Sequence, residues 1–120
     1  MAIEFSVYAG GMHHAFLEIL ASTDPADTDY HSVDLSDTVP NGTNHIAVHA
    51  HVTSTNTDDE LYLAKSARPS HYHHIITTVS NKEAAQFMIV GIDPATRYLW
   101  WKVTNARVSD VVIEMYYSWR

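Results

Sequence analysis

The segment from Gln86 to Arg120 reads QFMIVGIDPATRYLWWKVTNARVSDVVIEMYYSWR, and it decides the fold. It holds three apolar runs rich in Val, Ile, Tyr, Trp and Phe, side chains that suit a pleated sheet better than a helix. Asp93-Pro94 follows the first run and favours a turn, because proline fixes its own φ and pushes the preceding residue out of the helical region. The pattern predicts three consecutive antiparallel strands.

The rest of the chain shows short apolar stretches separated by turn signals, such as Val39-Pro40-Asn41-Gly42. Apolar and polar side chains alternate with a period of two, most clearly over residues 45–53. Residues 14–21 also fit one side of a helix, but their shortness and the preceding Gly-Gly favour a strand, and residues 80–85 predict a polar turn. Strands are expected over residues 3–8, 14–21, 30–35, 45–53, 61–64 and 72–79.

Eight or nine short strands with turns every 8–12 residues or so predict an all-β, antiparallel β-sandwich of jelly-roll-like type. The apolar face of each strand should form the core, since alternate side chains point to opposite faces of a sheet. The side chains expected in this core include Ile46, Val48, Val52, Ile89, Leu99, Trp101, Val111 and Ile113.

Length and composition limit the classes of protein. A chain of 120 residues with 46% apolar and 18% charged residues predicts one globular domain over residues 1–120. A net charge of −7 disfavours nucleic acid as a partner, and the absence of cysteine excludes disulfides and zinc–thiolate sites. No apolar run approaches the roughly 20 residues of a membrane helix. The first residues lack a signal-peptide pattern, which predicts synthesis in a cytoplasm.

From Val39 onward the order of turns and strands is VPNGTNHIAVHAHVTS, LYLAKS, QFMIVGIDPATRYLWWKV and VVIEMYYSW. This layout resembles the small jelly-roll-like β-sandwich modules of tailed-phage virion proteins, used in capsid decoration proteins and in tail-fibre or spike modules. It departs from their pattern at Tyr116-Tyr117, where such modules often carry Gly-Tyr, and in the stretch from His71 to His74. The resemblance implies a non-enzymatic virion structural protein without cofactors. It also implies a homotrimer, made in the host cytoplasm, with partners such as the major capsid protein.

Nine histidines are an unusual number for this length. His49 and His51 are two apart on a predicted strand, so both should point to one face, about 6–7 Å apart, where two imidazoles could share a metal ion. His71 and His73 form a second pair of the same kind. If the two strands paired, a site of three or four histidines would form.

Gly42, the His49-x-His51 pair and Glu60 echo the cupin pattern of a glycine, His-x-His and a glutamate. The glycine spacing is one residue too long, and the glutamate lies nine residues beyond the second histidine. A metal-dependent cupin-type enzyme is therefore an alternative. We favour histidines on a solvated face or a subunit contact, without a bound metal, because the other face of this strand is apolar throughout.

Two aromatic side chains, Tyr98 and Trp100, should lie on the face opposite Leu99 and Trp101. Exposed aromatic stripes stack on sugars, so a lectin-like carbohydrate-binding module is a second alternative. Tyr and Trp are also enriched at subunit interfaces, which we favour. Together with the His49 and His51 face, they predict a homo-oligomer, and the resemblance favours a trimer.

Overall fold

The computed structural model describes residues 3–7, 12–20, 27–68 and 72–118, with side chains for residues 15–20, 27–68 and 72–115. These residues form nine β-strands and no helix, so none of them belongs to a helix that could cross a membrane. The strands are β1 (Ile3–Val7), β2 (Met12–Leu20), β3 (His31–Asp34), β4 (His45–Ser54), β5 (Glu60–Ala64), β6 (His73–Ile76), β7 (Glu83–Gly91), β8 (Tyr98–Val103) and β9 (Val108–Ser118). The all-β prediction and the strand number are confirmed.

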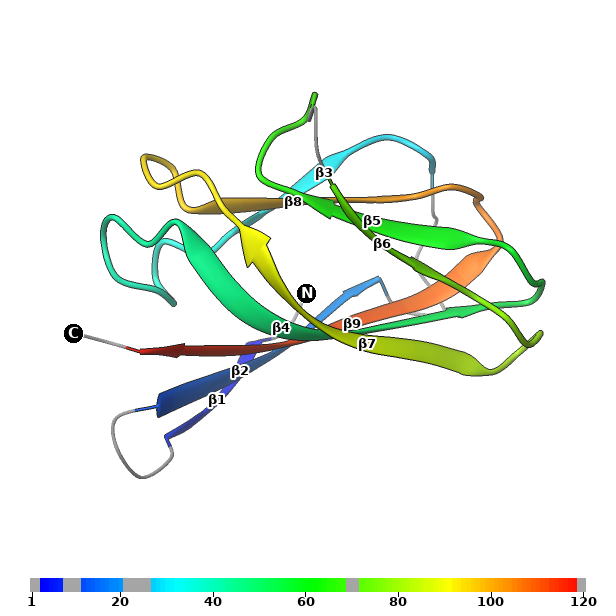
Figure 1. The fold of residues 1–120 in the computed structure, drawn as a ribbon, viewed down its shortest axis with the longest axis horizontal. Helices are drawn as coiled ribbons and strands as arrows, with labels where there is room; N and C mark the ends of the chain where they lie inside the picture. Colours follow the sequence, from blue (N-terminus) through cyan, green and yellow to red (C-terminus); the bar gives the residue numbers. More distant parts are fainter. Residues whose placement is uncertain (1–2, 8–11, 21–26, 69–71, 119–120) are drawn as a thin grey trace.

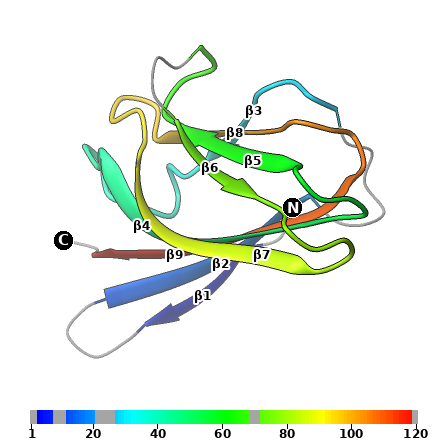
Figure 2. The same ribbon diagram turned by 45° about the vertical axis from the view of Figure 1, so that its right-hand side comes forward.

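The strands form two antiparallel sheets that lie face to face (Figure 1). Sheet A has the order β1-β2-β9-β4-β7, and sheet B has the order β3-β8-β5-β6. The pairing is nested, since β5 pairs with β6, β4 with β7, β3 with β8, and β2 with β9. The chain is thus one long hairpin with its tip at β5 and β6, rolled into two layers (Figure 2). This arrangement is a jelly roll, with β1 added at one edge, and the predicted fold class is confirmed.

The three C-terminal strands form as predicted, but no two of them are hydrogen-bonded to each other. The chain passes from β7 in sheet A to β8 in sheet B and then to β9 in sheet A. Each turn therefore crosses between the layers, and each strand pairs with partners distant in sequence. The polar turn predicted over residues 80–85 is too long, since β7 already begins at Glu83.

The core lies between the inner faces of the two sheets. All but one of the predicted core side chains are buried there, namely Ile46, Val48, Val52, Leu99, Trp101, Val111 and Ile113. The prediction for Ile89 is wrong, because this side chain is 62% exposed. Both faces of β7 carry apolar residues, and pairing of Ile46 with Val90 places the other face, with Met88 and Val90, in the core.

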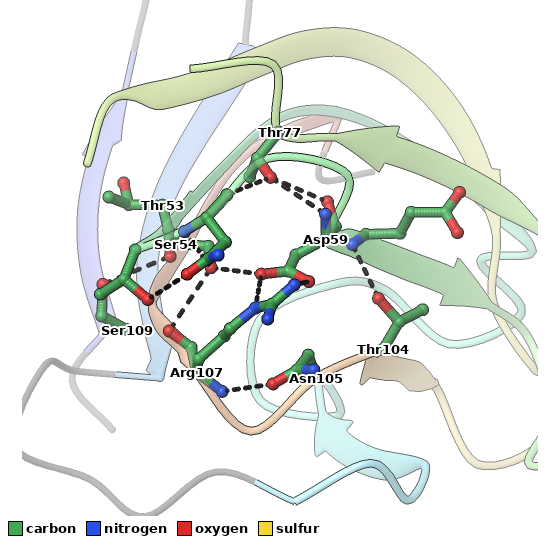
Figure 3. A network of polar contacts seen from close by, with 11 residues as sticks. Thr53, Ser54, Asp59, Thr77, Thr104, Asn105, Arg107 and Ser109 are labelled. Atoms are coloured by element: carbon green, nitrogen blue, oxygen red, sulfur yellow. Dashed lines mark hydrogen bonds and ion pairs between the residues drawn. The ribbon is translucent and has the colours of Figure 1, made fainter. Parts of the chain in front are cut away.

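A buried polar network ties the two sheets together at one end (Figure 3). Asp59, just before β5, accepts hydrogen bonds from the Arg107 guanidinium before β9 and from the Ser54 hydroxyl at the end of β4. The Asp59 amide donates to the Thr77 hydroxyl after β6, at 3.1 Å. One carboxylate thus fixes the ends of strands from both layers.

Candidate binding surfaces on the outer faces of the sheets

Each sheet has an outer face that points away from the core. Along β4 the buried residues alternate with His49 and His51, which are part-exposed on the outer face of sheet A, as predicted. The register with β7 and β9 brings further side chains beside them. We call this surface the histidine face; it comprises Ala47, His49, His51, Glu83, Phe87, Ile89, Asp110, Val112 and Glu114.

Two imidazoles and one carboxylate converge at the centre of the histidine face. The ring centroids of His49 and His51 are 4.3 Å apart. Glu114 on β9 lies between them, with Oε2 3.8 Å from His49 Nδ1 and Oε1 3.9 Å from His51 Nε2. Each residue offers one ligand atom, and these atoms lie within 4.8 Å of one another. Nitrogen and carboxylate donors at this spacing can hold a metal ion.

Carboxylates surround this group. Glu83 at the start of β7 is hydrogen-bonded to His51, with its Oε1 2.7 Å from Nδ1. Burial, followed by the negative charges of Glu18 and Glu83, raises the pKa of the Asp110 carboxyl, and His51 partly offsets this effect. The outer side of sheet A therefore carries a concentration of negative charge around the imidazoles.

The other predicted metal residues do not join this site. His73 lies on β6 in sheet B and is exposed, and β4 and β6 belong to different sheets, so the predicted site shared by the two strands does not form. His71 lies outside the described residues. Glu60, the glutamate of the cupin-like pattern, lies on β5 in sheet B and is hydrogen-bonded to His74 at 2.7 Å. It does not join His49 and His51 on sheet A, so the grouping in that pattern does not form.

Glu114 and Glu83 are neighbours of the histidines that the sequence does not predict. Glu114 lies on a strand paired with β4 in a register that is set by the whole sheet. Glu83 lies within residues 80–85, for which the sequence predicts a turn. Residues 83–87, Glu-Ala-Ala-Gln-Phe, do not alternate between apolar and polar side chains, so no local pattern marks the start of the strand at Glu83.

The histidine face also exposes large apolar side chains at its β7 edge. Phe87 is 59% exposed and Ile89 is 62% exposed, and both lie opposite outward-facing β4 residues, His49 and Ala47. Phe16 on β2, which is paired with Glu114, is half-buried on the same side. Apolar groups gathered on one outer face are typical of a contact surface.

The outer face of sheet B is rich in aromatic side chains. Tyr98 and Trp100 lie on it, half-buried, with ring centroids 6.3 Å apart, while Leu99 and Trp101 are buried as predicted. Tyr62 and Tyr72 stack at 4.3 Å. We call this surface the aromatic face; it comprises Tyr30, Tyr62, Tyr72, His74, Tyr98, Trp100 and Lys102.

Polar groups are held among these rings. The Lys102 ammonium lies 5.3 Å from the Tyr30 ring centroid and 5.5 Å from that of Tyr62, within the range of cation–π attraction. Burial raises the pKa of Tyr62 to about 12, with smaller contributions from a hydrogen bond to Tyr72 and the charge of Glu60. The face therefore combines ring surfaces with fixed hydrogen-bonding groups. The sequence predicts the position of Tyr98 and Trp100 but not the stacking of Tyr62 on Tyr72.

No protein-family model matches this chain, and no curated protein matches it significantly.

Proposed function

We propose that the protein is a non-enzymatic structural component of a phage particle, either a capsid decoration protein or a small tail-fibre or spike component. Jelly rolls are a common fold of viral capsid domains, although one fold serves many functions. The order of turns and strands from Val39 onward, which resembles virion modules, supports the same class. Its partners would be further copies of itself and other virion proteins, such as the major capsid protein.

The observation that carries this proposal is the exposure of Phe87 and Ile89 on the histidine face. The inner faces of both sheets already supply the core, and Ile89 lies outside it with 62% of its surface exposed. Their transfer from water into a contact would stabilise an assembly by about 25 cal/mol per Å² of apolar area. We infer that this face contacts another copy of the chain.

A second copy fits this face because the face carries both hydrogen-bond donors and hydrogen-bond acceptors. The His49 imidazole can donate a hydrogen bond, while the carboxylates of Glu83 and Glu114 can accept hydrogen bonds. A self-complementary surface of this kind is what closed homo-oligomers require. The resemblance favours three copies.

The oligomer is tested by light scattering on wild type, Ile89→Lys and the matched control Ile76→Lys. Ile76 is also exposed, at 41%, but it lies on sheet B. We expect the wild type to have the mass of an oligomer, Ile89→Lys to dissociate to monomer, and Ile76→Lys to remain assembled. A wild type that is monomeric at micromolar concentration would contradict self-association. Electron microscopy of the native particle, with labelled protein, tests its place on a capsid or tail.

A carbohydrate-binding module is a second candidate, favoured by the aromatic face. The Tyr62 and Tyr72 stack, Trp100 and the nearby Lys102 offer ring surfaces and polar groups of the kind that sugars use. A glycan array would show selective binding that Trp100→Ala removes and Phe87→Ala, on the other sheet, retains. The absence of any selective glycan would exclude this candidate and leave the structural role untouched.

A further inference from the structure

We propose that His49, His51 and Glu114 form a binding site for one divalent transition-metal ion of the Zn²⁺, Ni²⁺ or Cu²⁺ class. Two imidazoles and a carboxylate suit these ions, whereas Mg²⁺ and Ca²⁺ prefer oxygen ligands alone. Ligand atoms around one ion at about 2.1 Å lie about 3.4 Å apart in tetrahedral geometry. One ligand atom from each of the three residues lies within 4.8 Å of the other two, so side-chain rotations that shorten these separations would bring them to the spacing of a metal site.

His51 is held in the orientation and tautomer that a metal ligand needs. Its Nδ1 lies 2.7 Å from Glu83 Oε1, and because a carboxylate only accepts, Nδ1 carries the proton. In the neutral ring Nε2 then presents its lone pair toward Glu114 and His49. This Nε2 is buried and has no hydrogen-bond partner among the described residues. A carboxylate behind a ligating histidine is a recurrent feature of metal sites.

The three ligands sit on rigid elements. His49 and Glu114 occupy paired positions on β4 and β9, and His51 is two residues along the same β4 face. β4 and β9 are adjacent strands inside sheet A, with β7 on the far side of β4 and β2 on the far side of β9 (Figure 1). Paired strands fix the ligand spacing better than loops do.

The surroundings favour a cation and allow it to enter. Glu18, Glu83 and Asp110 contribute negative charge beside the ligands, and this charge raises the local concentration of cations. In the single chain the side chains of His49 and Glu114 are 37% and 27% exposed, so the ion reaches the site from solvent. Three protein ligands leave a fourth position for water.

The test uses untagged protein, stripped with a chelator, and titrates Zn²⁺ by calorimetry and Co²⁺ by visible absorption. We expect one ion per chain, with Mg²⁺ unable to compete. His49→Ala, His51→Ala and Glu114→Gln should each lose most of the affinity, and the Co²⁺ spectrum should change. Glu83→Gln should weaken binding by about 10–100-fold, as removal of a carboxylate behind a ligand does.

His74→Ala is the matched control, because His74 also contacts a glutamate, Glu60, but belongs to no group of three possible ligands among the described residues. It should bind Zn²⁺ as the wild type does. Circular dichroism establishes that each variant is folded, and substitutions on an outer face leave the core intact.

Absence of Zn²⁺ binding to the stripped wild type would overturn the proposal, as would affinity retained in both His51→Ala and Glu114→Gln. A loss of Zn²⁺ affinity in His74→Ala as large as that in the ligand variants would show nonspecific binding and would also overturn the proposal. The proposal does not rest on the proposed function, since all ligands come from one chain. Light scattering in the presence of chelator measures self-association separately.

Discussion

Arg107 holds the buried carboxylate of Asp59 with two parallel contacts, Nε to Oδ2 at 2.7 Å and Nη2 to Oδ1 at 3.0 Å. Asp59 comes just before a sheet B strand, and Arg107 just before a sheet A strand. The pair therefore connects the two layers where the core ends. Because the Asp59 side chain is buried, its charge depends on these partners in place of water.

Removing the charge of Asp59 should destabilise the fold. Asp59→Asn keeps the shape but weakens the contacts with Arg107 and Ser54, and we expect a loss of roughly 2–4 kcal/mol in the free energy of unfolding. Urea denaturation measures it. Asp58→Asn is the matched control, because Asp58 is exposed and its positive φ of 66° suits asparagine. Equal midpoints for the two variants would contradict the role of the pair.

The pair of Arg107 and Asp59 should make the free energy of unfolding depend on pH in the acid range. Hydrogen bonding from Arg107 and, to a smaller extent, from Ser54 lowers the pKa of the Asp59 carboxyl, against the opposing effect of burial. The folded pKa then lies below the unfolded one, so the stabilisation is present at neutral pH. It is lost below about pH 5 as the pH falls toward the folded pKa. Urea midpoints should fall more steeply with acid in wild type than in Asp59→Asn, and parallel slopes would refute this.

Two isoleucines of sheet A, on the strands that flank β4, should respond very differently to the same substitution. Ile113 is completely buried and Ile89 is 62% exposed. Ile113→Ala should cost about 2–5 kcal/mol in the free energy of unfolding, because it leaves a cavity in the core. Ile89→Ala should change it by no more than about 0.5 kcal/mol. Thermal or urea unfolding of the protein, at a concentration where it is not self-associated, compares them directly.

Tyr62 should ionise later than an ordinary tyrosine. Burial raises its pKa to about 12, with help from Tyr72 and the charge of Glu60. Since the folded pKa lies above the unfolded value, the associated stability is present below about pH 10 and is lost as the pH rises through 10 toward 12. Ultraviolet titration of tyrosinate should show a late step that disappears in Tyr62→Phe. Persistence of that step in the variant would assign it to another residue.

The alternation of inward and outward side chains along a single strand is predictable from the sequence. In β4 and β8 one set of alternate side chains is apolar and the other polar or aromatic, so the burial of Val48 and Leu99 and the outward position of His49 and Trp100 could be predicted. In β7 both sets contain large apolar residues, and the prediction for Ile89 failed. Alternation with a period of two assigns the side chains of a strand to its two faces. When both faces are apolar, it does not show which of them packs against the other sheet.

Local sequence thus determined the strands, their turns and the face on which His49 and His51 lie, because backbone geometry alternates side chains whatever the strand pairs with. Only the tertiary structure decided the neighbours across strands. The nested pairing of the jelly roll brings Glu114 beside His49 and leaves Glu60 on the other sheet. Strand register is fixed by the sum of packing over both sheets, so the carboxylate that completes the candidate metal site lies far away in the sequence, where no local pattern marks it.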